Sequence, residues 1–181
     1  DVMLARLFGE RSSGFYIDIG AWHPTELSAT KHFYDLGWSG INVEPLRKQF
    51  ELFIAERPRD LNLCVAVTDH KGPLRFYECA SDTSLSTIDD ALAATLAKEG
   101  HEITSYTVDS VTPAEIFAHS KGKTVDFVKI DVEGCEERIL RSVDWQSFRP
   151  RALVIEAAPR LNQKLDWDHI AALRNWDVWE P

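Results

Sequence analysis

Short apolar runs alternate along the chain with longer stretches in which apolar residues recur at helical spacing. The runs are rich in Val and Ile, as is typical of strands buried on both faces of a sheet. The pattern predicts strands over Phe15–Ile19, Gly40–Val43, Asn62–Val67, Val125–Ile130 and Ala152–Ile155. It predicts helices over Thr25–Leu36, Leu46–Glu56, Thr87–Lys98, Pro113–His119 and Glu136–Ser142.

Local signals refine two of these elements. Ser86 can cap the helix over Thr87–Lys98, with Asp89 in a capping-box position and Gly100 just after the end. The alternating stretch Leu74–Cys79 follows a turn, which predicts a strand at an edge or in a hairpin.

Strands that alternate with helices predict an α/β fold with a doubly wound, mostly parallel sheet. We expect one domain over residues 1–181. Its cofactor-binding half would span about residues 14–70, and its substrate and catalytic half would span about residues 80–160. In such sheets, ligands bind beyond the carboxyl ends of the strands, where the strand order reverses.

Charge and composition narrow the function classes. The net charge is −9, from 29 acidic and 20 basic residues, and this sign disfavours a nucleic-acid partner. No stretch approaches the roughly 18 to 20 apolar residues of a membrane span, and no signal peptide is visible. The three cysteines, Cys64, Cys79 and Cys135, are scattered, which favours reduced thiols and a cytoplasmic protein.

Carboxylates follow nearly every predicted strand. The strand ends carry Asp18-Ile19-Gly20, Glu44-Pro45, Thr68-Asp69, Asp131-Val132-Glu133-Gly134 and Glu156. An acid at one strand end is ordinary, because Asp caps the following helix well. Like charges that converge on one edge repel each other, so their repetition indicates a functional site there.

The first strand ends in a glycine turn that differs from a dinucleotide-binding loop. Gly20 is not followed by the two further glycines of such loops. Trp22 would block the close approach of a pyrophosphate to the backbone, and Pro24 lacks the N–H group that would bind its phosphates. Glu44, at the end of the next strand, suits a carboxylate that accepts hydrogen bonds from both ribose hydroxyls. A ribose without a pyrophosphate points to an adenosyl ligand such as S-adenosylmethionine.

Six stretches carry a resemblance to a known family. They are "FYIDIGAWHP", "FYDLGWSGINVEP", "LNLCVAVTDHKGPLRFYE", "SLSTID", "VDFVKIDVEGCEERIL" and "RPRALVIEA". In this order, over roughly residues 14–158, the chain resembles the FkbM family of S-adenosylmethionine-dependent methyltransferases. Many members of that family have Asn and Gly where this chain has Trp22 and Pro24.

The resemblance implies a Rossmann-like, class I methyltransferase fold and a set of cofactor-binding residues. The set is Asp18, Gly20, Ala21, Trp22, Glu44, Pro45, Val67 and Asp69. The loop from Asp18 to Ala21 would hold the methionine end of the cofactor, Glu44 its ribose, and Val67 to Asp69 would lie towards the adenine. Asp131 would lie near the methyl group.

Methyl transfer to a hydroxyl requires the removal of a proton. Asp131 is the first candidate for the base, and His23, directly after the cofactor loop, is the second. A divalent ion between Asp131 and Glu156 is an alternative, although two carboxylates are few ligands for a dedicated metal site. The Asn/Asp-Pro-Pro-aromatic signature of exocyclic-amine methyltransferases is absent, which favours an oxygen acceptor. The family resemblance implies that this oxygen is a hydroxyl of a sugar, glycan or natural product.

Two other functions share these features. A nicotinamide-dependent oxidoreductase would use the same ribose acid, although Trp22 and Pro24 oppose it. A non-catalytic adenosyl-binding module of a larger protein is the other.

The resemblance also implies a terminal antiparallel strand pair, yet only "WDVWEP" follows the helical stretch Asp168–Asn175. We therefore expect part of that pair to be missing. The exposed sheet edge would then be covered by a continuation of the chain, by a second copy in a homodimer or by another chain.

Overall fold

The computed structural model describes residues 2–156. Its centre is a five-stranded sheet in the order β3-β2-β1-β7-β8, and all four neighbouring pairs are parallel. The strands are β1 (Phe15–Ile19), β2 (Ser39–Val43), β3 (Leu61–Leu63), β7 (Phe127–Ile130) and β8 (Ala152–Ile155). The strand order reverses between β1 and β7, so the predicted doubly wound α/β fold is confirmed.

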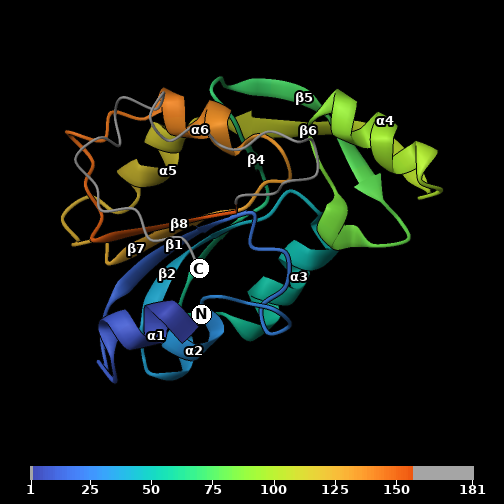
Figure 1. Cartoon of the computed structure of the whole chain (residues 1–181). Helices are drawn as coiled ribbons and strands as arrows, with labels where there is room; N and C mark the ends of the chain where they lie inside the picture. Colours follow the sequence, from blue (N-terminus) through green and yellow to red (C-terminus); the bar gives the residue numbers. More distant parts are fainter. Residues whose placement is uncertain (1, 157–181) are drawn as a thin grey trace.

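Helices cover both faces of this sheet (Figure 1). One face carries α1 (Val2–Phe8) and α2 (Lys31–Asp35), and the opposite face carries α5 (Pro113–Ala118) and α6 (Glu136–Ser142). Each face has its own apolar cluster: Phe33 and Trp38 pack with Phe127 on the first, and Ile116 and Ile139 pack on the second. The helix α3 (Arg47–Glu56) connects β2 to β3.

Side-chain caps explain where two helices begin. At α5, the Thr112 side chain accepts from the Glu115 amide and the Glu115 side chain accepts from the Thr112 amide, with Pro113 in the first turn. At α4 (Asp90–Lys98), the Asp89 side chain accepts from the Leu92 amide at 2.7 Å. The prediction that Ser86 caps a helix beginning at Thr87 was wrong, because Asp89 is the cap itself.

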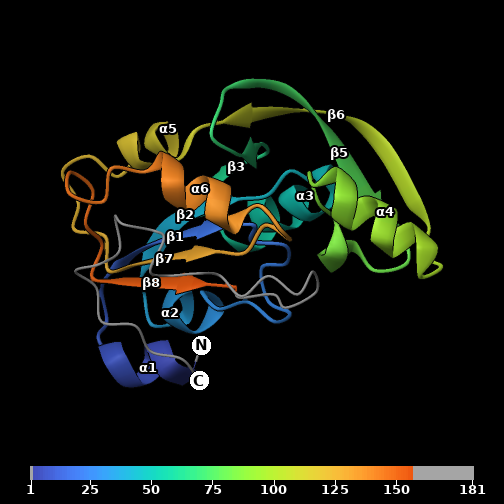
Figure 2. The same cartoon turned by 45° about the horizontal axis from the view of Figure 1, so that its top comes forward.

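A second sheet lies beyond the carboxyl ends of the central strands, together with α4 (Figure 2). Its order is β4-β6-β5, formed by β4 (Ala66–Val67), β6 (Ile103–Val111) and β5 (Gly72–Cys79). β5 and β6 are antiparallel over their whole length, and β5 lies at the edge, as predicted for Leu74–Cys79. A 3-10 turn, η1 (Thr83–Leu85), follows β5.

Two predicted elements have different bounds. The strand expected over Asn62–Val67 is divided: β3 joins the central sheet, and β4 joins the second sheet beside β6. The helix expected over Thr25–Leu36 is reduced to Lys31–Asp35, because Leu27 has a left-handed backbone (φ 51°) that no α-helix accommodates.

Two elements, α1 and β6, were not predicted. The predicted helix Asp168–Asn175 and the final segment "WDVWEP" lie outside the described residues. In the part of the chain that the structure describes, no helix is both long and apolar enough to cross a membrane.

Candidate active site

A cavity lies where the strand order reverses. Its walls come from the carboxyl ends of β1, β2 and β7, from β4 and β5, and from residues 83–88 after β5. The predicted site residues that line it are Gly20, Ala21, Trp22, Glu44, Pro45, Val67 and Asp131. Strands from both sheets thus bring these side chains together around one space.

Gly20 has a specific steric reason to be glycine. Its φ is +76°, and a Cβ added there would lie 1.7 Å from the carbonyl oxygen of Asp131. The turn after β1 is therefore packed against the backbone at the end of β7. Since α2 begins only at Lys31, no helix N-terminus follows this turn, unlike the turn that binds a pyrophosphate.

Glu44 is buried in the cavity wall and is held by two backbone amides. Its Oε1 accepts from the Leu46 amide at 2.7 Å, and its Oε2 accepts from the Trp22 amide at 2.8 Å. Burial raises its pKa to about 7, although both amides favour the ionised form. A carboxylate has about four acceptor positions, so two remain for the hydroxyls of a ligand.

Lys129 is the central cation of the site. It lies in β7 in register with Asp18 of β1, and its Nζ donates to the carbonyl oxygen of Gly20 at 2.8 Å. The same Nζ lies 3.1 Å from Oδ2 of Asp131 and 3.5 Å from Oδ1 of Asp18. Burial opposes the charged form of Lys129, but the two aspartates outweigh it and raise its pKa.

Asp18 supports the cavity from behind and does not line it. Its side chain is almost completely buried and accepts from the Thr30 hydroxyl at 3.1 Å. Burial raises its pKa, against the opposing effects of Lys129 and Thr30. Asp18 therefore ties β1 to β7 and to the segment before α2.

The family model of the Methyltransferase FkbM domain matches residues 18–177. The chain belongs to the FkbM methyltransferase family. The resemblance seen in the sequence motifs is thereby confirmed, and the matched range includes every cavity residue from Ile19 to Glu133.

A solved structure of the methyltransferase FkbM from Methylobacillus flagellatus KT matches with a TM-score of 0.54 at 16% sequence identity. The match covers 90% of this chain and 38% of that chain, so the present chain spans well under half of that protein's length. At this identity the similarity shows a shared FkbM fold. No curated protein matches the chain.

Besides Asp18, the predicted site residues His23 and Asp69 of this FkbM domain lie away from the cavity lining. The Nδ1 of His23 accepts from the amides of Thr25 and Glu26 at 3.2 and 3.0 Å, so its neutral form carries the proton on Nε2. This tautomer has no free lone pair, and the basic role of His23 stays a prediction. Asp69 is about half exposed and bonds to Thr68 and His70.

Carboxyl groups of the FkbM domain also gather behind Asp131. Asp131, Glu136 and Glu156 each offer an oxygen within 4.8 Å of the others. The Glu136 oxygens already accept from the amides of Val132 and Gly134. Burial, followed by the hydrogen bond and charge of Asp131, raises the pKa of Glu156 to about 8. These surroundings therefore favour the protonated form of Glu156.

Sequence reasoning missed two groups of cavity residues. Lys129 was visible as a cation inside an apolar strand, in the motif "VKIDVEG". The second group comes from Thr83 and the motif "SLSTID" that directly follows it. Thr83 accepts from the Trp22 indole at 3.0 Å, and Thr87 donates to the carbonyl oxygen of Glu133 at 2.6 Å. Only the tertiary fold brings this segment opposite β1.

Proposed function

We propose that this FkbM-family chain binds S-adenosylmethionine in the cavity and transfers its methyl group to a hydroxyl oxygen of a sugar, glycan or natural product. The observation that carries the proposal is the place of Glu44. It lines the cavity at the end of β2 beside the Gly20 turn, with two acceptor positions remaining for ribose hydroxyls.

The residues present fit an adenosyl ligand better than a dinucleotide. Asp131 backbone atoms fill the space next to Gly20, and the Trp22 indole crosses to Thr83, so a pyrophosphate has neither close backbone approach nor a helix N-terminus. The acidic surroundings, with Glu44, Asp131 and Glu133 along one cavity, also suit a ligand with sulfonium and ammonium charges.

The bound cofactor would supply an activated methyl group on a positively charged sulfur. The chain has to hold the acceptor oxygen in line with it, and well-oriented groups reach effective molarities of about 10⁵–10⁸ M. The side chain of Asp131 is 32% exposed, so an acceptor can reach its carboxylate. We assign to Asp131 the removal of the hydroxyl proton, a contribution of about 10²–10⁴-fold.

Lys129 and Glu156 are the charged and polar neighbours of this base. Lys129 forms an ion pair with Asp131 at 3.1 Å. Burial favours the protonated form of Glu156, which donates a hydrogen bond to Asp131. Loss of that proton makes the pair a stronger proton acceptor. A divalent ion on Asp131, Glu136 and Glu156 is the alternative arrangement.

The proposal is tested by thermal unfolding with S-adenosylhomocysteine, S-adenosylmethionine and NAD. A ligand at 100 times its Kd adds about 2.7 kcal/mol of stability. For a chain of this size that corresponds to a rise in Tm of roughly 5–10 °C. We expect this rise with both adenosyl ligands and none with NAD. A rise with NAD alone would favour the oxidoreductase function.

A further inference from the structure

Arg57 is a completely buried cation behind the wall of the cavity. It ends α3, where its amide donates to the carbonyl oxygen of Phe53 at 2.8 Å, and its own carbonyl oxygen accepts from Asn62 at 3.1 Å. Its guanidinium lies 4.6 Å from the centre of the Tyr34 ring. The backbone and the side chain of Arg57 are thus fixed by separate elements.

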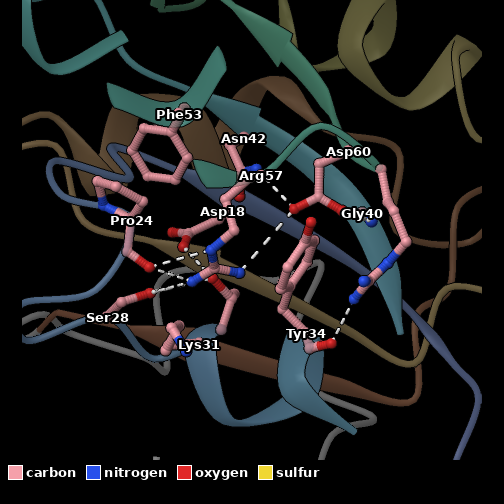
Figure 3. A network of polar contacts seen from close by, with 12 residues as sticks. Asp18, Pro24, Ser28, Lys31, Tyr34, Gly40, Asn42, Phe53, Arg57 and Asp60 are labelled. Atoms are coloured by element: carbon pink, nitrogen blue, oxygen red, sulfur yellow. Dashed lines mark hydrogen bonds and ion pairs between the residues drawn. The ribbon is translucent and has the colours of Figure 1, made fainter. Parts of the chain in front are cut away.

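The guanidinium uses all three of its nitrogens, and two of them hold the loop after β1 (Figure 3). Nε donates to the carbonyl oxygen of Pro24 at 3.0 Å, and Nη2 donates to the same oxygen and to the Ser28 hydroxyl, the latter at 3.2 Å. Nη1 donates to the hydroxyl of Tyr16 at 3.2 Å. A single side chain therefore links β1, α3 and residues 24–28.

The countercharge of Arg57 is Asp60, which directly precedes β3 and bonds to residues of the sheet and not to the loop. Oδ2 of Asp60 lies 4.0 Å from Nη1 of Arg57. Asp60 also accepts from the Tyr16 hydroxyl at 2.6 Å, from Asn42 at 2.9 Å and from the Gly40 amide at 2.8 Å. A buried ion pair of this kind adds little net stability compared with apolar side chains of the same volume. A contribution to the stability of the fold is therefore a weak explanation for a buried arginine at position 57.

The loop that Arg57 holds has a strained backbone. Trp22 and Leu27 have φ values of 50° and 51°, which side chains other than glycine rarely adopt, and both residues line the cavity. Such conformations persist only when the surrounding contacts determine them, and they gather at functional sites. Arg57 bonds to Pro24, which lies between the two strained residues, and to Ser28, which directly follows Leu27.

The strained loop in turn completes the wall beside Glu44. In this conformation the Trp22 amide donates to Oε2 of Glu44 at 2.8 Å, and the Trp22 indole donates to Thr83 at 3.0 Å. The loop therefore orients the carboxylate and connects the end of β1 to the second sheet. If the loop relaxed, Glu44 would lose one of its two amide partners.

We infer that Arg57 is a positioning residue of the cavity: it holds residues 22–28 in the conformation in which Trp22 orients Glu44 and closes the wall against Thr83. The inference rests on the proposed function only for its ligand-binding consequence. The geometry of the loop can be tested in the ligand-free protein.

The test compares Arg57→Lys with Tyr16→Phe. Arg57→Lys keeps the charge opposite Asp60 but loses the planar fork that reaches Pro24 and Ser28 together. Tyr16→Phe removes a hydroxyl from the same buried network without touching the loop. Hydrogen exchange of the Trp22 amide in the ligand-free proteins reports on the loop, and calorimetry measures affinity for S-adenosylhomocysteine.

In Arg57→Lys we expect the loop to adopt its binding conformation only about one tenth of the time. Exchange at the Trp22 amide should then be about tenfold faster, and S-adenosylhomocysteine should bind about tenfold more weakly. Tyr16→Phe should lower Tm and leave both readouts near the wild-type values. Wild-type exchange and affinity in a folded Arg57→Lys protein would overturn the inference, and so would equal changes in both variants. If the wild type binds no S-adenosylhomocysteine, the proposed function fails, while the exchange rates still decide the role of Arg57.

Discussion

The ammonium group of Lys129 lies 3.1 Å from the carboxylate of Asp131, at the edge of the sheet where the strand order reverses. The same group lies 3.5 Å from the carboxylate of Asp18, so one cation serves two acids on adjacent strands. With Asp18 almost completely buried, the pair of carboxylates depends on Lys129 for its compensating charge. This relationship makes Lys129 the electrostatic centre of the cavity.

Replacement of Lys129 by Met should therefore destabilise the fold and raise the pKa of Asp18 further. Loss of one partner from a buried ion pair costs about 3–5 kcal/mol, and we expect about 2–3 kcal/mol here because Asp131 is partly exposed. Urea unfolding measures the loss. Lys71→Met is the control, because Lys71 forms an exposed ion pair with Glu115 and should change little. Equal losses in both variants would contradict the central role of Lys129.

The close contact between Gly20 and Asp131 predicts that alanine is more destabilising at position 20 than at another glycine with a positive φ. In Gly20→Ala the new Cβ would collide with the carbonyl oxygen of Asp131, whereas Gly100→Ala meets nothing within 4 Å at a similarly positive φ. We expect about 3 kcal/mol of destabilisation for Gly20→Ala and about 1 kcal/mol for Gly100→Ala. Thermal unfolding of the two proteins checks the order, and similar Tm values would show that the turn can move away from β7.

The pKa of Glu44, near 7, predicts that ligand affinity depends on pH. An ionised carboxylate accepts more hydrogen bonds than a protonated one, so affinity for S-adenosylhomocysteine should rise between pH 6 and pH 8. In Glu44→Gln the affinity should be weaker and should not show this rise. Calorimetric titrations across the range measure it, and a parallel rise in both proteins would assign the titration to another group.

The same shift predicts that the ligand-free protein loses stability as pH rises from about 4.5 towards 7. The folded protein keeps a proton on Glu44 that the unfolded chain has released, so the unfolded state binds fewer protons and stability falls with pH. Glu156 extends this fall to a pH of about 8. Urea unfolding at several pH values should show a smaller fall in Glu44→Gln than in the wild type.

Asp131 should act on turnover more than on cofactor affinity. The nearly isosteric change Asp131→Asn removes the base and should lower turnover by about 10²–10⁴-fold on any acceptor that the wild type methylates. Affinity for S-adenosylhomocysteine should change little. Near-normal turnover would show that Asp131 only completes the turn before Gly134. Loss of wild-type activity on chelation, with recovery on added Mg²⁺ or Mn²⁺, would instead support a metal on Asp131, Glu136 and Glu156.

The parts of the fold that are buried on both faces could be predicted from the sequence. β1 is buried at all five positions and has the predicted bounds, because a continuous apolar run of this length suits a central strand. β8 also has the predicted bounds, although its residues are only half-buried. β6 was missed because most of its residues are exposed or half-buried and "ITSYTVDSV" contains few apolar positions. Pairing with β5 forms this strand, and that pairing is not a local property of the sequence.

The candidate site shows the same division. Glu44, Gly20 and Asp131 were predicted because each follows a predicted strand, and ligands of such sheets bind beyond the carboxyl ends of the strands. The role of Arg57 could not be predicted, because it lies at a helix end and depends on a loop that the sequence pattern assigned to a helix. Left-handed conformations at Trp22 and Leu27 are set by these tertiary contacts and have no signal in residue type.

The central claim, that Glu44 holds the ribose of an adenosyl cofactor, is tested most directly by calorimetric titration of S-adenosylhomocysteine into three proteins. Glu44→Ala removes hydrogen bonds to a charged acceptor, each worth about 1.5–3 kcal/mol, so affinity should fall at least about tenfold. Glu51→Ala, which removes an exposed carboxylate from α3, should bind like the wild type. Unchanged affinity in a folded Glu44→Ala protein would contradict the claim and place the cofactor elsewhere.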